Sequence, residues 1–189
     1  MSQQPARALA LVGMPGAGKT LCAKHLEQQG FFQFRFGSII TDEVSRRGWA
    51  INPDNERIIR EEIRANEGMD AIARRALPLL KNALTSHDCV VIDGLYSFSE
   101  YKLLQPAFEG QLIVIAISCD RHLRYQRLAQ RTERPLTPQE AERRDILEIE
   151  NLEKGGPIAI ADYTLLNNAD ATRILNQLDE LLTALNFRP

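Results

Sequence analysis

Five short apolar runs, each followed by a longer stretch with helical spacing, limit the folds open to this chain of 189 residues. Most of the runs are nearly continuous in apolar residues, which is typical of strands buried on both faces of a parallel sheet. Parallel strands joined through helices form right-handed βαβ units. The sequence therefore predicts a three-layer α/β fold. The expected strands are 8–12, 32–36, 89–92, 112–117 and 163–166.

Helical patterns fill the intervals between these runs. Gly30 provides a stop for a first helix over 19–29, and Asn52 with Pro53 provides a start for another. Since no internal repeat or low-complexity linker is present, we expect one domain over residues 1–189. Further helices are expected at 69–83, 99–104, 121–131, 138–151 and 171–185, and loops at 133–138 and 154–157.

Composition argues against several classes of protein. The formal net charge of −2 gives no general attraction to nucleic acid or to an anionic membrane surface. No apolar run approaches the roughly 18 residues of a membrane span, and residues 1–7 lack a signal-peptide core. The three cysteines lack CxxC spacing, so we expect reduced thiols rather than disulfides or zinc ligands. These features predict a cytoplasmic protein and leave its oligomeric state open.

The stretch "LVGMPGAGKT" at residues 11–20 fits the pattern GxxxxGK followed by Ser or Thr, between an expected strand and an expected helix. Glycines let the backbone wrap closely around a phosphate, and the following helix adds its positive dipole end. Lys19 is expected to bridge the β- and γ-phosphates of ATP, and Thr20 to hold Mg²⁺. The residues expected to bind ATP are Gly13, Met14, Pro15, Gly16, Ala17, Gly18, Lys19 and Thr20.

The run "CVVIDG" ends in an acid and places Asp93 at the carboxyl end of a buried strand, where open α/β sheets bind ligands. There Asp93 could hold Mg²⁺, directly or through water, or accept a proton from the attacking group. The sequence leaves both roles open. An alternative is that Asp93 closes a turn with Gly94 or caps a helix that begins near Ser97.

Between residues 121 and 144 the basic residues are seven arginines and no lysine. At helical spacing, four of them fall within about 80° of one another and predict one cationic ridge. Guanidinium groups on a movable segment could clamp ATP and stabilise transition-state charge. The alternative is a solvated face whose arginines pair with Glu140, Glu142 and Asp145. The four ridge residues are Arg124, Arg127, Arg131 and Arg134.

Several segments together resemble the P-loop small-molecule kinases. They are "LVGMPGAGKT", "VVIDGLYSFSEY", "RLAQR", "RRDILEIENLEKGG" and "ADYTLLNN". The chain is most similar to a largely archaeal nucleotide-kinase-like family, related to adenylate kinases and dephospho-coenzyme A kinases. The resemblance spans nearly the whole chain. It implies a parallel five-stranded core, a helical acceptor-binding region at 37–85 and an arginine-bearing lid at 121–144.

The resemblance also implies roles for single residues. Asp93 would lie beside the metal, and Arg127 and Arg131 would be lid arginines. Arg144 and Asp145 would belong to the segment that follows the lid. The loop after the last strand would lie near the adenine base and would bring nucleotide contacts from Asn167 and Asn168.

The region after the second expected strand, "FGSIITDEVSRRG", departs from the resembled kinases. Ser38 and Thr41 stand where relatives tend to carry an aspartate and an arginine, and Tyr96 replaces an arginine common after the "DG" pair. Arg60 and Arg64 lie four residues apart, on one helical face, and are candidates for gripping an acceptor phosphate. They could equally pair with Glu56, Glu61 or Glu67.

These features predict a Mg²⁺-dependent kinase that transfers the ATP γ-phosphoryl group to a small phosphorylated acceptor. A nucleoside monophosphate is the first choice of acceptor and dephospho-coenzyme A the second. The alternative is a regulatory ATPase or switch that acts on a protein or RNA partner, and a third possibility is a nucleotide binder with little catalysis. The expected catalytic residues are Lys19, Asp93, Arg127 and Arg131, and the expected metal-binding residues are Thr20 and Asp93.

Overall fold

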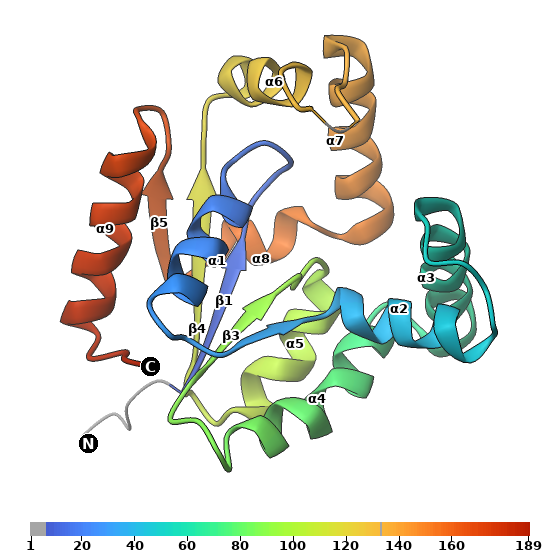
Figure 1. Ribbon diagram of the computed structural model, residues 1–189, viewed down its shortest axis with the longest axis horizontal. Coiled ribbons are helices and arrows are strands. Elements are labelled where there is room, and N and C mark those ends of the chain that lie inside the picture. The colour runs from blue at the N-terminus through green and yellow to red at the C-terminus, as the bar shows by residue number, and fades with distance from the viewer. Residues whose placement is uncertain (1–6, 133) are drawn as a thin grey trace.

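The computed structural model describes residues 7–132 and 134–189 and contains one parallel sheet with the strand order β2-β3-β1-β4-β5 (Figure 1). Every neighbouring pair of strands in this sheet is parallel. The predicted three-layer α/β fold with a parallel five-stranded sheet is confirmed, and every strand end lies within one residue of the expected one. The strands are β1 (Ala8–Val12), β2 (Gln33–Arg35), β3 (Val90–Asp93), β4 (Leu112–Ser118) and β5 (Tyr163–Leu166).

Strand β1 lies at the centre of the sheet and is buried along its whole length. Ala10 of β1 lies opposite Ile92 of β3 and Val114 of β4. Alternate residues of β1 contribute to two hydrophobic clusters, one on each face of the sheet. A strand covered on both faces has no polar side to show, which explains its continuous apolar sequence.

Two layers of helices cover the sheet, and further helices lie at its carboxyl edge (Figure 1). On one face lie α1 (Lys19–Gln28) and α9 (Ala171–Ala184). On the other face lie α4 (Ala71–Ala83), α5 (Phe98–Ala107) and α8 (Gly155–Ala159). Figure 1 shows α6 (Arg121–Ala129) and α7 (Pro138–Leu152) over the carboxyl ends of the strands, with α2 (Gly37–Arg46) and α3 (Pro53–Glu67) to one side.

Three expectations about local structure need correction or restriction. Helix α2 lies within the helical region at 37–85 that the resemblance implies, but it was not predicted as a separate helix, although its buried residues Ile39, Ile40 and Val44 have helical spacing. The expected loop at 154–157 contains the start of the short helix α8. The expected loop at 133–138 includes residue 133, which lies outside the described residues, and α7 begins within it, at Pro138.

Side-chain caps fix where two helices begin. The side chain of Asn52 accepts a hydrogen bond of 2.9 Å from the amide of Asn55, which confirms the predicted start of α3. At α5, Ser97 and Glu100 form a reciprocal capping box. Helix α5 therefore has a cap of its own and does not use Asp93.

The described part of the chain has no helix that is both long enough and apolar enough to cross a membrane. Cys22, Cys89 and Cys119 are free thiols. Burial raises the pKa of the Cys22 thiol to about 11, so it is protonated at neutral pH and behaves as a small apolar side chain.

Close packing of α8 against α5 yields a test of the fold. A Cβ added at Gly156 would lie 2.6 Å from both Cβ and Cγ of Phe98, whereas a Cβ added at Gly155 would meet nothing within 4 Å. We expect Gly156→Ala to lower the free energy of unfolding by about 1–3 kcal/mol, because the overlap is with the rigid base of a side chain. Gly155→Ala should change it by less than about 1 kcal/mol. Urea unfolding of both variants tests this, and equal stabilities would contradict it.

Candidate active site

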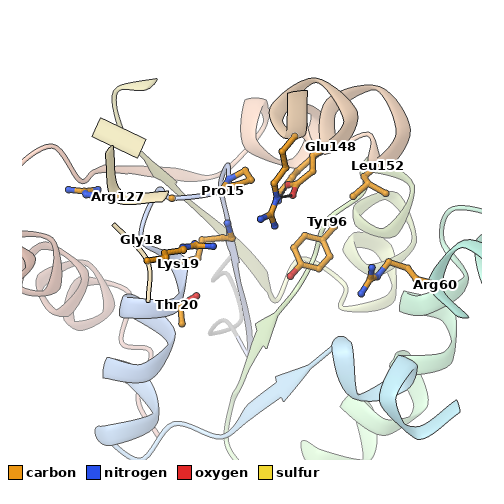
Figure 2. Close-up of a pocket in the computed structure, with 13 residues that line it drawn as sticks. Pro15, Gly18, Lys19, Thr20, Arg60, Tyr96, Arg127, Glu148 and Leu152 are labelled. Atoms are coloured by element: carbon orange, nitrogen blue, oxygen red, sulfur yellow. Dashed lines mark hydrogen bonds and ion pairs between the residues drawn. The ribbon is translucent and has the colours of Figure 1, made fainter. Parts of the chain in front are cut away.

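A cavity of about 430 Å³ lies where the loop after β1 faces the segment after β3 and the helices α3, α6 and α7 (Figure 2). Six of the lining side chains are basic, and within the described residues Glu148 is the only acid that lines it. A cavity with this imbalance attracts anions although the chain has a net negative charge. It is lined by Pro15, Gly16, Gly18, Lys19, Thr20, Arg60, Tyr96, Arg127, Arg131, Arg144, Glu148, Leu152 and Lys154.

At three positions of the loop between β1 and α1, the backbone has a conformation that only glycine adopts freely. The φ angle is 146° at Gly13, 80° at Gly16 and 113° at Gly18. A Cβ at Gly16 would lie 2.8 Å from the carbonyl oxygen of Arg124, and a Cβ at Gly18 would overlap the side chain of Asn167. Helix α1 follows at once, and no side-chain hydrogen bond from the described residues caps it at Gly18. Its first amides and its positive dipole end are thus available to a phosphate.

Lys19 lies in the middle of the cavity, between the loop and Tyr96 (Figure 2). Its ammonium donates hydrogen bonds to the carbonyl oxygens of Gly13 at 2.6 Å and Met14 at 3.3 Å. Burial, and next the positive charge of Lys154, lower the pKa of Lys19 to about 7. An anion bound here would favour the charged form of the lysine and raise this pKa.

Thr20 lines the cavity, whereas Asp93 stands beside it at the end of β3. The Asp93 side chain is 34% exposed, with a carboxylate oxygen 4.0 Å from Nε of Arg35. Its charge reaches Lys19 and acts to raise the pKa of that lysine. Hydroxyl and carboxylate oxygens are ligands that Mg²⁺ prefers, so Thr20 and Asp93 fit that ion chemically.

The predicted ridge of four arginines does not form, because helix α6 ends at Ala129 and one of the four is buried. Arg124 donates to both carboxylate oxygens of Asp145, at 3.0 and 2.6 Å, and to the carbonyl oxygen of Pro15 at 3.0 Å. It belongs to the packing between α6, α7 and the loop. Arg134 lies beyond α6, has a φ of 52° and does not line the cavity.

Arg127 and Arg131 both line the cavity. The Arg127 guanidinium donates to the carbonyl oxygen of Asn167 at 2.9 Å and to Sγ of Cys119 at 3.2 Å. Burial, and next the charge of Arg144, lower the pKa of Arg131, so these two guanidinium groups repel each other within the cavity. A bound anion would relieve that repulsion.

The two asparagines after β5 do not line the cavity. Asn167 is buried and donates a hydrogen bond of 2.7 Å to the carbonyl oxygen of Ala17. Asn168 accepts one of 2.9 Å from the backbone amide of Asp120. They tie the loop after β5 to the loop after β1 and to the start of α6. Contact between Asn168 and a nucleotide stays a prediction.

The two candidate acceptor arginines of α3 lie in different surroundings. Arg60 lines the cavity, whereas Arg64 does not. Arg64 is buried with its Nη2 atom 3.3 Å from Oε1 of Glu100, so the expectation that it grips an acceptor, or pairs with an acid of its own helix, is corrected. Arg64 lies about one turn after Arg60 on α3, and this shift places its side chain against α5 instead of in the cavity. Burial raises the pKa of Glu100, and its carboxylate also caps α5.

Four residues that complete the cavity had no role predicted from the sequence, namely Tyr96, Glu148, Leu152 and Lys154. In Figure 2, Tyr96, Leu152 and Arg60 lie across the cavity from Gly18 and Arg127. Glu148, Leu152 and Lys154 come from "EIENLEKGG", a segment that carried part of the family resemblance. In the sequence, Glu148 and Lys154 look like charges on an ordinary solvated helix face. Only the resemblance to the kinase family could have drawn attention to them.

The fold and the glycine loop define a P-loop nucleotide-binding domain with the architecture of the small-molecule kinases. Residues 9–148 match the AAA domain family. The chain is 30% identical over 183 residues to a UPF0200 protein of Thermococcus sibiricus. The aligned region covers 95% of this chain and 96% of that protein. The chain therefore belongs to the AAA domain family and to the UPF0200 family.

Solved structures of small-molecule kinases share this fold. Shikimate kinase from Bacteroides thetaiotaomicron is 16% identical with a TM-score of 0.58, over 94% of this chain and 98% of that one. A gluconokinase from Sinorhizobium meliloti is 14% identical with a TM-score of 0.56, over 98% of each chain. At this identity the likeness establishes the fold alone.

The lowered pKa of Lys19 predicts that nucleotide binding takes up a proton. At pH 8 an amine with a pKa of about 7 is mostly neutral in the free protein, and a polyphosphate favours its ammonium form. We expect an uptake of roughly one proton per bound nucleotide at pH 8 and much less at pH 6, so affinity falls as the pH rises above 7. Calorimetry in buffers of different ionisation enthalpy measures this, and equal uptake at both pH values would contradict it.

Proposed function

We propose that this protein is a Mg²⁺-dependent kinase that transfers the γ-phosphoryl group of ATP to a small phosphorylated acceptor. One observation carries the proposal. A single cavity has a phosphate-binding loop on one side and Arg60 on the other, and Lys154 also lines it. Phosphoryl transfer needs the donor and the acceptor held in line across such a space, and basic side chains beyond the loop suit an acceptor that is itself an anion.

On the donor side, the loop from Gly13 to Thr20 binds the ATP phosphates through its amides. Lys19 contacts the β- and γ-phosphates, and Arg127 and Arg131 neutralise charge that develops on the transferred group. Thr20 and Asp93 would hold Mg²⁺, which when bound supplies positive charge between the phosphates.

A nucleoside monophosphate is the acceptor that suits the cavity best. Its attacking atom is a phosphate oxygen that already carries negative charge and needs no base. Glu148, the acid in the lining, is engaged by Arg144 and Lys154 and is therefore poorly placed to accept a proton. A hydroxyl acceptor such as dephospho-coenzyme A is the second choice, and Asp93 would then have to serve as the base.

A panel of acceptors tests the proposal directly. The protein is incubated with ATP and Mg²⁺ together with nucleoside monophosphates, dephospho-coenzyme A, or no acceptor, and ADP release is followed by a coupled assay. We expect one monophosphate to raise turnover at least about 100-fold above hydrolysis. Hydrolysis that no acceptor stimulates would refute the transferase and support the alternative, a regulatory ATPase that acts on a protein or RNA partner.

Asp93→Asn should separate catalysis from nucleotide binding. Loss of the carboxylate removes either a metal ligand or a proton acceptor, so turnover should fall at least about 100-fold. Affinity for Mg²⁺-free ADP depends on the loop after β1 and should stay within about threefold. Asp88→Asn is the matched control, since Asp88 is exposed and lies just before the start of β3, at the opposite end of the strand from Asp93. If both variants keep wild-type turnover, Asp93 has no part in the reaction.

Arg60→Met should weaken acceptor binding selectively. Removing a guanidinium that contacts a phosphate should raise the acceptor KM about 10- to 100-fold and leave the KM for ATP nearly unchanged. Arg57→Met is the control, because Arg57 lies on the same helix and its exposed side chain pairs with Glu61 at 3.2 Å. Equal effects of the two substitutions on the acceptor KM would remove Arg60 from the site.

A further inference from the structure

The lining of the cavity contains a buried lysine to which neither the sequence pattern nor the chemistry proposed above assigns a specific contact. Lys154 is 5% exposed and lines the cavity. Its ammonium forms an ion pair with Glu148 and lies 4.9 Å from the centroid of the Tyr96 ring. Glu148 also accepts a hydrogen bond of 2.9 Å from Nε of Arg144. One carboxylate therefore serves two cations.

The backbone around Lys154 is fixed by contacts that do not involve its side chain. Glu153 ends α7 in the left-handed region, with a φ of 54°. Its carboxylate accepts hydrogen bonds from the amide of Ser99 at 2.8 Å and from the Ser99 hydroxyl at 2.7 Å. Gly156 then packs directly on Phe98. The turn is thus anchored to the start of α5, and this anchor directs Lys154 to the cavity.

An ion pair is a poor choice for packing alone at this position. Removing two charges from water opposes folding, and an apolar pair of similar size would be at least as stable. Glu148 would still have Arg144 as a partner if Lys154 were absent. The lysine is therefore not needed to satisfy the acid, and its position on the cavity wall points to an anion from outside.

We propose that Lys154 binds the anionic group of the acceptor, and that Glu148 is the counter-ion of Lys154 in the ligand-free protein and releases it when the acceptor phosphate arrives. This inference rests on the proposed function and deepens it. Glu148 keeps Arg144 as its partner, so no buried carboxylate is left unpaired. The acceptor class that follows is a phosphate monoester, because a neutral sugar could not replace the carboxylate.

Inorganic phosphate is a probe that does not require the acceptor to be known. The protein is saturated with the Mg²⁺ complex of a non-hydrolysable ATP analogue, and phosphate is then titrated and followed by amide chemical shifts. We expect phosphate to shift the amides around Lys154 in the wild type. In Lys154→Met the dissociation constant for phosphate should rise at least about 10-fold, as for loss of one charge-assisted hydrogen bond. In Glu148→Gln it should fall about threefold or more, because the competing carboxylate is gone.

Lys102→Met is the matched control. Lys102 is also a lysine over an aromatic ring, 5.1 Å from the centroid of Phe98, but it is exposed and does not line the cavity. It should leave phosphate binding unchanged. If Lys154→Met does not fold, as judged by thermal unfolding, Glu148→Gln decides the question alone. A purely structural ion pair predicts that both substitutions weaken phosphate binding or leave it unchanged.

The outcomes separate this inference from the proposed function. Opposite effects of the two cavity substitutions support the inference. Unchanged phosphate binding in Lys154→Met, unchanged or weaker binding in Glu148→Gln, or no phosphate binding in the wild type would overturn it while binding of the ATP analogue still stands. Failure of the wild type to bind the ATP analogue would instead overturn the proposed function.

Discussion

The shape of the candidate active site depends on two hydrogen bonds that hold the backbone of the loop after β1. Arg124 donates a hydrogen bond to the carbonyl oxygen of Pro15, and Asn167 donates one to the carbonyl oxygen of Ala17. Because these carbonyls are bound on the far side, the loop amides are left for phosphate. The arginine is paired with buried Asp145, and removing either partner of such a pair leaves an uncompensated charge. Helix α6, helix α7 and the end of β5 must therefore be in place before the loop has its final shape.

The features that could be predicted from the sequence are those encoded within short segments. Near-continuous apolar runs predicted β1, β3 and β4 because burial on both faces leaves no alternation. The runs at β2 and β5 were also predicted, although these edge strands are only partly buried or exposed. The spacing of Gly13, Gly18 and Lys19 predicted the loop because strand, loop and helix follow one another directly in the chain. Helix α2 was missed because it follows strand β2 after a single residue, so no connecting segment separates the two patterns.

The features that could not be predicted depend on which neighbour covers a given helix face. Helical spacing correctly places Arg60 and Arg64 on one side of α3. Arg64 is nevertheless buried, because it pairs with Glu100, which lies 36 residues further along the chain. For Arg124 the alternative interpretation named Asp145 as a partner but placed the arginines on a solvated face, whereas the pair is buried between α6 and α7. Periodicity gives the direction of a side chain relative to the axis of its own helix, whereas its burial depends on how elements distant in the sequence pack against that helix.

The charges of the cavity also connect its two halves. The ammonium of Lys154 lowers the pKa of Lys19, so each lysine is less stable as a cation because the other is present. A phosphate bound at Lys19 would raise the pKa of that lysine and keep it charged at neutral pH. Two anionic substrates repel each other in water, but in this cavity part of that repulsion would be offset by the attraction of both to the two lysines. In the proposed reaction, donor and acceptor phosphates would thus be held close together by a protein whose own net charge is negative, because the compensating positive charge is concentrated in the cavity.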